Sequence, residues 1–477
     1  MPHFINLRTF SGKPLNIVFQ VTAFVIVFGV LCSIFNDDPV VADGYENLTT
    51  AMNIRRNGVF SSQDSPQPLP DMKREPLHPF LVLLYTILLG LSDYSVSQLA
   101  TEFASYFKVY NVLLIALAVS IAVGWGQALT GKSLLPFAVV TVCACALYAG
   151  VPRLVNRFNS EPLGMLLLLL ASRSFYFSVV GESTRPSYFL GIWLGLLALT
   201  KAHFLLLGPI ILGIAALRVP KRALIAGIVF CVLVLPWMLR NYIQFGDPNV
   251  SKRGMPVLAV RYSLVNDLTD EEFSCMAYAV SHPRMRETVG KVLGVNSDSF
   301  LRHGKCQRLN RETCFDTALE RVPCKAFPED VKAVADQNPD EAIQLWYKGM
   351  ITGQLLEAKK LLATEVFRPT LATIWRFLTT LPLFMYRGVW FTESILLCMI
   401  CVVSLLALLF SEYRWISVIA LSSCLFQVIA THNLPRFHLI ETAVMLVAIV
   451  LVTNNLGSFL RNSLGKIIVG RRGGRHD

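Results

Sequence analysis

The sequence predicts an all-α fold, a polytopic transmembrane helical bundle of about ten spans. The chain has 477 residues, of which 54% are apolar and 16% are charged, whereas soluble chains carry roughly a quarter charged residues. Apolar runs of about 20 residues recur along it, and each is long enough to cross a hydrocarbon core of roughly 30 Å. Backbone polar groups find no water in lipid, so these runs must be helices. We therefore expect an integral membrane protein surrounded by membrane lipids.

The first apolar run, residues 16–35, is predicted to be a membrane anchor. It is too long and too apolar for a cleaved signal peptide, and no convincing small-residue cleavage site follows it. Arg8 and Lys13 precede the run, which places the N-terminus in the cytoplasm under the positive-inside rule. The chain then emerges on the far side at about Asn36.

An amphipathic outer loop is expected over residues 36–107. Leu48, Ala51, Met52 and Ile54 recur at near-helical spacing and supply one apolar face. The apolar run 78–91 is short for a span and suits a helix lying at the membrane interface. We expect two or three such surface helices in this loop.

Six further spans follow before the next long polar segment. Basic residues in two of the turns, Lys132 and the group Arg218, Lys221 and Arg222, place those turns in the cytoplasm. The predicted spans are residues 108–129, 134–149, 163–180, 188–200, 202–217 and 223–239.

The chain divides into three predicted parts. Residues 1–240 form a transmembrane module, residues 241–370 a helical extracytoplasmic loop domain, and residues 371–477 the last spans with a basic cytoplasmic tail. The last spans are predicted at 394–410, 415–431 and 435–452. Both termini are then cytoplasmic in a multi-pass inner (plasma) membrane protein.

Four cysteines fall within the polar loop domain: Cys275, Cys306, Cys314 and Cys324. An even number of cysteines in a soluble loop predicts two disulfides and an oxidising compartment. Their spacing fits no zinc pattern, and three connectivities remain open. The remaining cysteines lie in apolar runs and are interpreted as packing residues.

The formal charge of +11 does not indicate a nucleic-acid partner. The basic residues are dispersed over short loops and tails, so the positive-inside effect explains much of the excess. The chain also has no glycine-rich loop of the kind that holds nucleotide phosphates. This absence fits a substrate carried by a lipid better than one carried by a nucleotide.

The predicted topology brings many polar side chains to the outer face, mostly at helix ends. Charged groups at such depths usually face a cavity or reach for the membrane surface. Their convergence predicts an outward-facing site for an anionic ligand. The residues concerned are Asp43, Arg74, His78, Glu161, Lys201, His203, Arg240, His432, Arg436 and His438.

Several short segments follow one another in a defined order along the chain. They are Asp43-Gly44-Tyr45, Asn57-Gly58-Val59-Phe60-Ser61, Arg74-Glu75-Pro76 with Pro79, Leu194 to Lys201, Pro236-Trp237 with Arg240-Asn241-Tyr242 and Phe245-Gly246-Asp247-Pro248, and Asn433-Leu434-Pro435-Arg436-Phe437. Together they resemble the GT-C membrane glycosyltransferases, in the bacterial polyprenyl-phosphate-sugar-dependent branch of protein mannosyltransferases and aminoarabinose transferases. The resemblance covers the first seven spans well and the last spans loosely, and it does not cover the cysteine-bearing loop.

The resemblance implies an inverting glycosyltransferase that moves a sugar from a polyprenyl phosphate to an envelope acceptor. Such a transfer needs a base for the acceptor hydroxyl and cations for the departing phosphate. Asp43 matches the acidic residue of the family's first loop and is the candidate base; the alternative is that it caps a helix over residues 44–57, and one residue could do both. The candidate donor-phosphate ligands are Arg74, Lys201, Arg240 and Arg436.

The candidates for binding acceptor or metal are Glu161, Glu46 and His78. Better-known family members pair two adjacent acidic residues in the first loop, whereas here Gly44 follows Asp43. The residues therefore leave open whether a divalent cation, Mg²⁺ or Mn²⁺, takes part. No other cofactor is implied, and the acceptor could be a glycan, a lipid or a protein.

Two other classes of protein also have many spans and polar loops. An O-antigen polymerase or ligase would place its essential basic residues in the late loop, between 241 and 369. A lipid-linked-sugar transporter or flippase would show broken helices and paired charges at mid-membrane depth. In this sequence the charges lie at helix ends, and no internal repeat is evident.

Overall fold

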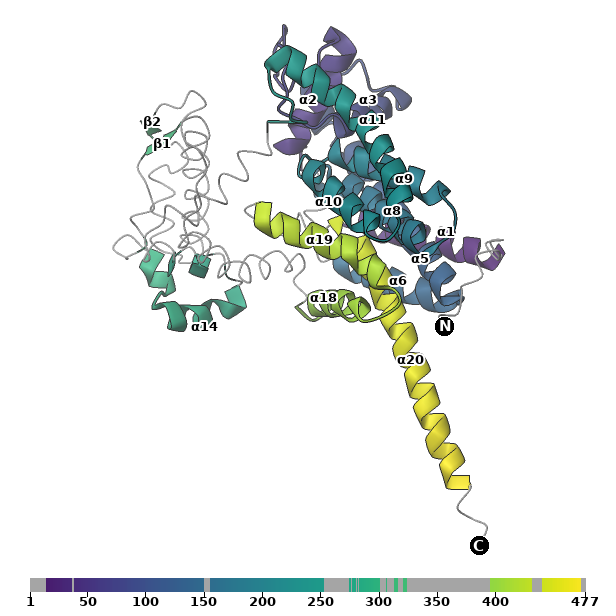
Figure 1. Cartoon of the computed structure of the whole chain (residues 1–477). Helices are drawn as coiled ribbons and strands as arrows, with labels where there is room; N and C mark the ends of the chain where they lie inside the picture. Colours follow the sequence, from purple (N-terminus) through teal and green to yellow (C-terminus); the bar gives the residue numbers. More distant parts are fainter. Residues whose placement is uncertain are drawn as a thin grey trace. The chain divides into compact units, whose positions relative to one another are not determined.

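We describe a computed structural model of the chain (Figure 1). The description covers residues 14–36, 38–149, 155–252, 274–275, 277–279, 281, 283–300, 306, 313–315, 321–323, 395–430 and 440–472. The chain divides into two compact units. The first comprises residues 1–251, 391–423 and 438–477, and the second comprises 252–390 and 424–437.

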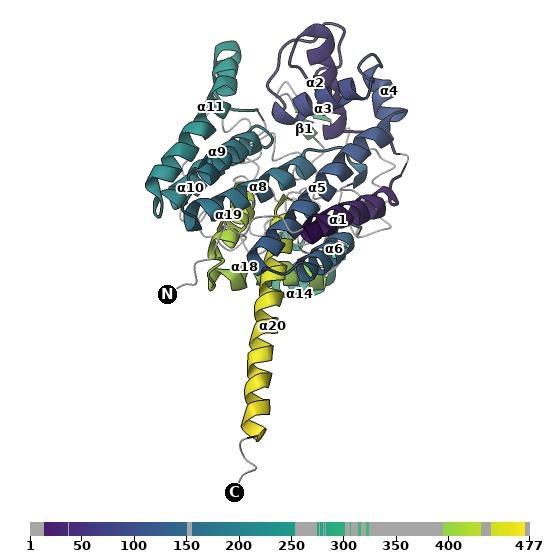
Figure 2. The same cartoon turned by 90° about the vertical axis from the view of Figure 1, so that its right-hand side faces the viewer.

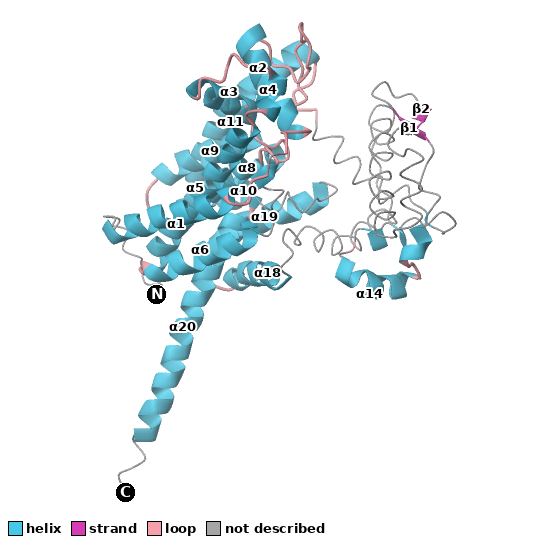
Figure 3. Ribbon diagram, turned by 180° about the vertical axis from the view of Figure 1, so that it is seen from behind, coloured by secondary structure: helices cyan, strands magenta, loops and turns pink. Residues whose placement is uncertain are grey.

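The regular secondary structure of the described residues is helical apart from one pair of short strands, and loops and turns connect these elements (Figure 3). In the first unit the helices are α1 (Pro14–Cys32), α2 (Asp43–Asn57), α3 (Leu77–Leu88), α4 (Val96–Thr101), α5 (Ala104–Thr130), α6 (Leu134–Ala149), α8 (Glu161–Val180), α9 (Arg185–Ala198), α10 (Phe204–Ala216), α11 (Pro220–Phe245), α18 (Ile395–Leu409), most of α19 (Arg414–Ala430) and α20 (Thr442–Arg472).

The long apolar helices pack around α5 and α8. Helix α5 contacts α1, α6, α8 and α20, and α8 also contacts α9. Four helices, α1, α5, α8 and α11, are long and apolar enough to cross a membrane among the described residues. This confirms the predicted all-helical bundle, and the four long apolar helices suggest a membrane protein. The helices α6, α9 and α10, with 16, 14 and 13 residues, coincide with predicted spans but are shorter than those four.

Successive helices run in alternating directions. At one end, Lys108 near the start of α5 donates to the carbonyl of Asn36, which follows α1. At the other end, Ser133 before α6 donates to Asn16 in the first turn of α1, at 2.7 Å. The same end holds the turn between α8 and α9, where Arg222 donates to the carbonyl of Gly181. Polar contacts therefore gather at the two ends of the bundle.

Close packing between α9 and α11 depends on a glycine. A Cβ atom on Gly191 would lie 2.4 Å from the carbonyl oxygen of Ala226 and 2.8 Å from Cβ of Val229. Because any larger side chain would force the two helices apart, Gly191 sets their separation. This contact places the last turn of α11 on the side of the bundle where α9 ends.

The predicted surface helices α2, α3 and α4 lie side by side at one end of the first unit (Figures 1 and 2). Leu48 and Met52 of α2, Val82 of α3 and Leu99 of α4 are buried against each other. The same core includes Phe107 of α5 and extends to Phe158, before α8. The outer loop is therefore anchored on the bundle by an apolar core of its own.

The second unit contains α14 (Pro283–Leu293), the short 3₁₀ helix η2 (Ser297–Phe300) and an antiparallel pair of strands, β1 (Thr313–Phe315) and β2 (Arg321–Pro323). Cys275 and Cys306 form a disulfide with an S–S distance of 2.07 Å. One of the two predicted disulfides therefore forms, between the first two of the four cysteines. Cys314 lies in β1, and Cys324 lies outside the described residues.

Two predicted helix boundaries differ from the structure. The last predicted span began at residue 435, whereas α20 begins at Thr442 and continues to Arg472. The N-cap of α2 is Ala42, and Asp43 is the first residue of the helix. The interpretation of Asp43 as the helix cap was therefore wrong, because the side chain of Asp43 lies inside the first turn.

Candidate functional site

The candidate site begins where the chain enters α2. Ala42 has a φ angle of 51°, the only positive φ outside glycine among the described residues. A side chain with a Cβ atom rarely adopts this backbone conformation, so it stores strain. The next residue but one, Gly44, allows close contact with the bundle, because a Cβ atom there would lie 2.5 Å from the carbonyl oxygen of Phe158. Asp43 is held between these two constrained positions.

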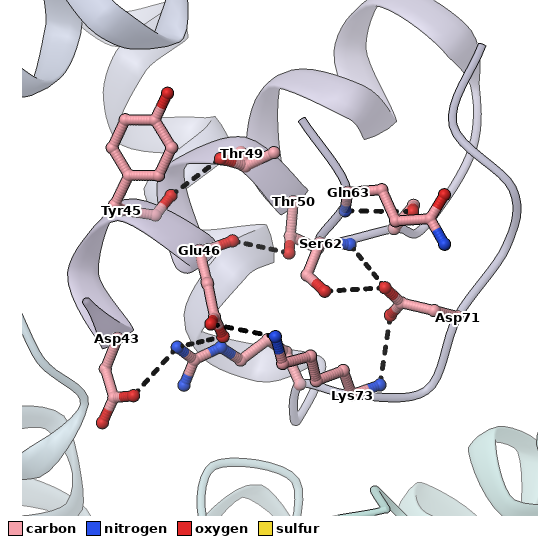
Figure 4. A network of polar contacts seen from close by, with 11 residues as sticks. Asp43, Tyr45, Glu46, Thr49, Thr50, Ser62, Gln63, Asp71 and Lys73 are labelled. Atoms are coloured by element: carbon pink, nitrogen blue, oxygen red, sulfur yellow. Dashed lines mark hydrogen bonds and ion pairs between the residues drawn. The ribbon is translucent and has the colours of Figure 1, made fainter. Parts of the chain in front are cut away.

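The central contact of the site is made by Arg74. Its Nη2 atom lies 3.1 Å from Oδ1 of Asp43 and contacts Oε2 of Glu46. Asp43 and Glu46 are three residues apart on one face of α2, so both carboxylates reach the same guanidinium. Figure 4 shows their side chains directed the same way, while Tyr45 points elsewhere. Lys73 adds a second cation, with Nζ 3.0 Å from Oε1 of Glu46.

These groups differ in their exposure to solvent. The side chain of Arg74 is 4% exposed, whereas those of Asp43 and Glu46 are 28% and 26% exposed. Arg74 is therefore buried beneath two carboxylates that are partly exposed to solvent. Its Nε atom is buried and has no hydrogen-bond partner. Such a donor is costly to leave unpaired, and a bound ligand is one way to pair it.

A tight turn before Arg74 is fixed by Asp71. The Asp71 carboxylate accepts hydrogen bonds from the backbone and hydroxyl of Ser62, at 2.8 and 2.7 Å, and from the backbone of Lys73 at 3.1 Å. The carbonyl of Asp71 accepts from Nη1 of Arg240 at 3.2 Å. The last turns of α11 thus hold the segment that carries Lys73 and Arg74.

Arg240 itself is surrounded by aromatic rings. Its guanidinium carbon lies 5.5 Å from the ring centre of Phe60, 4.8 Å from Trp237 and 5.1 Å from Phe245. These distances are those of cation–π contacts. Arg240 was predicted to bind donor phosphate, but its described contacts are with these rings, with the carbonyl of Asp71 and with Oδ1 of Asn241, which accepts from Nη1 at 2.8 Å. We interpret it as a residue that positions the loop.

The segment after Arg74 is tied to the junction of α9 and α10. The backbone N–H of Leu77 donates to the carbonyl of Leu199 at 3.0 Å. The Glu75 carboxylate accepts from the hydroxyl of Ser251 at 3.2 Å and from the backbone of Ala202 at 3.5 Å. These bonds bring Arg74 and Lys201, which were both predicted site residues and are far apart in the sequence, to the same end of the bundle.

A second ion pair lies at that junction. Nζ of Lys201 is 3.1 Å from Oε1 of Glu161, at the start of α8, and Glu161 is almost fully buried. Lys201 was predicted to bind phosphate and Glu161 to bind acceptor or metal. The structure pairs the two with each other.

His78 lies near the basic side chains of Arg74 and Lys201. It is 1% exposed, and neither ring nitrogen has a hydrogen-bond partner. Its ring packs against Phe158 and Tyr110, with centroid distances of 5.2 and 5.9 Å. Burial, with the positive charges of Lys201 and Arg74, lowers the pKa of His78 to about 3. His78 is therefore neutral at physiological pH.

The charges of the site are balanced. Three carboxylates, Asp43, Glu46 and Glu161, are paired with three cations, Lys73, Arg74 and Lys201. A site with both a partly exposed carboxylate and a buried guanidinium can take up a proton at one group while it stabilises negative charge at the other. That combination suits group transfer to a hydroxyl.

Three residues of the predicted site, Arg436, His432 and His438, lie outside the described residues. Among the described side chains, no group of three or more histidine, cysteine, aspartate or glutamate residues is arranged to hold a metal ion. Lys73, Asp71 and Glu75 were not among the predicted site residues, although the run from 71 to 75 is visibly rich in charge.

The comparisons with known proteins gave no match. The chain matches no model of a known protein family, no curated protein and no solved structure. The function must therefore be argued from the site itself.

Proposed function

We propose that this protein is an integral membrane glycosyltransferase that moves a sugar from a polyprenyl phosphate to an acceptor hydroxyl, with inversion at the sugar carbon. The observation that carries the proposal is the buried guanidinium of Arg74, held between the partly exposed carboxylates of Asp43 and Glu46. Asp43 is the base, and Arg74 is the cation that receives the donor phosphate. The order of GT-C-like segments in the sequence supports the same assignment.

The chemistry moves one negative charge over a short distance. The acceptor oxygen forms a bond to the anomeric carbon while the bond from that carbon to the phosphate oxygen breaks. The acceptor proton passes to Asp43, which becomes neutral, and the electron pair of the broken bond stays on the polyprenyl phosphate, which gains a charge. Because Arg74 contacts Asp43, its guanidinium can stabilise the carboxylate before transfer and the phosphate after it.

The ion pair between Lys201 and Glu161 has a supporting role in this step. Lys201 lies beside Glu161 and adds positive potential near His78. His78 is neutral, and its two ring nitrogens can accept or donate a hydrogen bond without adding charge. We assign Lys201 and Glu161 to the stabilisation of the donor end of the site.

We place the site at the extracytoplasmic face of the inner membrane, with about ten spans and both termini in the cytoplasm. The alternating helices support this topology, since Lys132, Arg218 and Arg222 lie at the end opposite to Asp43 and suit the cytoplasmic side. The disulfide between Cys275 and Cys306 suits an oxidising compartment for the second unit. A sugar donor carried by a lipid would reach the site from within the bilayer.

Mass spectrometry of envelope glycans and glycolipids tests the proposal. Cells that lack the gene should lose one sugar from one acceptor. The gene should restore that sugar, and the Asp43→Asn variant, made at equal level in the membrane, should not. Unchanged glycans and glycolipids in the deletion strain would contradict the proposal. Movement of a lipid-linked sugar across vesicles without a new glycosidic bond would favour a flippase instead.

A further inference from the structure

A pocket of about 460 Å³ lies beside the ion-paired carboxylates, between the chain segment that enters α2 and the helix α4. Pro39, Val40 and Val41 line its apolar part, and Ala100 of α4 contributes to the same side. The segment is fixed there, because the N–H of Val40 donates to the carbonyl of Ala100 at 2.7 Å. The pocket is thus part of the folded outer loop.

The polar part of the pocket consists of hydroxyl groups and one carboxylate. Ser97 and Thr101 of α4 are exposed at its rim, and Glu46 of α2 completes the lining. Ser97 and Thr101 are four residues apart, so they project from the same face of α4. Hydroxyl and carboxylate groups beside an apolar surface match a sugar, which has polar edges and apolar C–H faces.

Helical geometry connects this pocket with the base. Residues 42, 45 and 46 of the segment and of α2 line the pocket, while residues 43 and 46 face Arg74. Glu46 therefore stands at the border of the two faces and belongs to both. Asp43 itself does not line the pocket, but it lies in the chain between the lining residues Ala42 and Tyr45, and its carboxylate shares the guanidinium of Arg74 with Glu46.

The wall that separates the pocket from Asp43 is strained. Ala42 lines the pocket and has the positive φ angle described above. Tyr45, which also lines it, is fixed by a hydrogen bond of 2.6 Å from its hydroxyl to Oδ2 of Asp64. Strained and fixed residues at a concave surface are typical of ligand sites, where shape has to be held before binding.

We propose that this pocket binds the sugar portion of the acceptor and that Glu46 orients the hydroxyl that receives the new bond. The inference rests on the proposed function and names the substrate class of the same site, an acceptor that ends in a carbohydrate. The carbohydrate could belong to a free glycan or to a glycolipid, since both present the same headgroup to Glu46, Ser97 and Thr101.

Saturation-transfer NMR on the full chain in lipid nanodiscs tests this binding. The probes are disaccharides offered singly: lactose, maltose, cellobiose, mannobiose and N,N′-diacetylchitobiose. We expect at least one of them to receive saturation from the protein above the level of empty nanodiscs. For lactose, nanodiscs that contain lactosylceramide give the glycolipid arm. Displacement of soluble lactose by lactosylceramide would indicate a glycolipid acceptor, and no displacement a free glycan.

Two variants, each with an exposed serine or threonine replaced, make the test specific. Ser97→Trp and Thr101→Trp fill the pocket from its rim, and we expect both to reduce the signal to that of empty nanodiscs. Ser105→Trp is the matched control, since Ser105 is exposed and outside the pocket lining. It should keep the signal. Equal thermal midpoints for the three variants show that the fold is retained.

The outcomes separate this inference from the proposed function. No saturation of any disaccharide, or an unchanged signal in both pocket variants, would overturn the pocket assignment. Asp43→Asn should still bind the disaccharide while it fails to transfer a sugar. If wild-type protein binds a disaccharide through Ser97 and Thr101 but never transfers a sugar, the pocket stands and the glycosyltransferase proposal fails. If transfer proceeds with an unchanged acceptor KM in Ser97→Trp and Thr101→Trp, the glycosyltransferase proposal stands and the pocket assignment fails.

Discussion

Removing the two carboxylates that surround Arg74 should destabilise the protein far more together than singly. Asp43→Asn or Glu46→Gln alone leaves Arg74 one charged partner, and we expect each to lower the free energy of unfolding by about 1 kcal/mol. The double variant leaves a guanidinium that is 4% exposed without either carboxylate. Lys73, at 53% exposure, adds only further positive charge.

The expected size follows from the burial of Arg74. An uncompensated buried charge costs about 3–5 kcal/mol, so the double variant should lose about that amount. The sum of the single variants is about 2 kcal/mol, and the coupling energy is then about 1–3 kcal/mol. The two carboxylates themselves contribute less to this cost, because the side chains of Asp43 and Glu46 are 28% and 26% exposed.

Unfolding by sodium dodecyl sulfate in mixed micelles measures these free energies. Glu287→Gln serves as the control, because the pair Lys291–Glu287 is exposed at both side chains and should contribute nothing measurable. Additive losses in the double variant would refute the reasoning, since they would show that Arg74 does not depend on a shared pair of carboxylates.

Three further predictions follow from single residues. Ala42→Gly should raise the free energy of unfolding by about 1 kcal/mol in the same assay, because glycine relieves a positive φ; a loss of stability would contradict the strain. Arg240→Lys keeps the charge but loses the planar contact with Phe60, Trp237 and Phe245. We expect it to lower the thermal midpoint in detergent, at a cost of about 1 kcal/mol in stability. An unchanged midpoint would count against a positioning role. His78 has a pKa of about 3 in the folded protein, below its ordinary value of 6.5. The unfolded chain therefore binds the proton first, and wild-type stability should fall as the pH drops from 6.5 towards 3, by at most about 1.4 kcal/mol for each pH unit. His78→Phe should lose less stability over that range, and equal pH dependence would contradict the burial of a neutral His78.

The sequence predicted the helical membrane protein because hydrophobic length is a local property. The apolar runs at 16–35, 108–129, 163–180 and 223–239 correspond to α1, α5, α8 and α11. The surface helices were also predictable, since Leu48, Ala51 and Met52 recur at helical spacing and are buried in α2. The exact start of α20 was not, because apolar residues such as Leu439 and Ile440 also precede Thr442 and are interrupted only by single polar residues.

The site was predictable only as a set of residue types. Asp43 and Arg74 were placed in one outer loop, but their contact spans 31 positions in the chain and depends on how the loop folds. The pairing of Lys201 with Glu161 depends on the packing of α8 against the α9–α10 junction. The backbone strain at Ala42 arises where Val40 bonds to α4, and no local pattern in the sequence indicates it. Side-chain partners in tertiary contacts therefore required the structure.

The central claim is that Asp43 removes a proton from an acceptor while Arg74 stabilises the departing phosphate. The most direct measurement is the release of polyprenyl phosphate from a radiolabelled polyprenyl-phosphate sugar by the purified protein in nanodiscs with membrane extract as acceptor. We predict release and a labelled glycoside with wild-type protein, and loss of both with Asp43→Asn and with Arg74→Met. Full release by Asp43→Asn, or no release by the wild-type protein with any polyprenyl-phosphate sugar, would contradict the account.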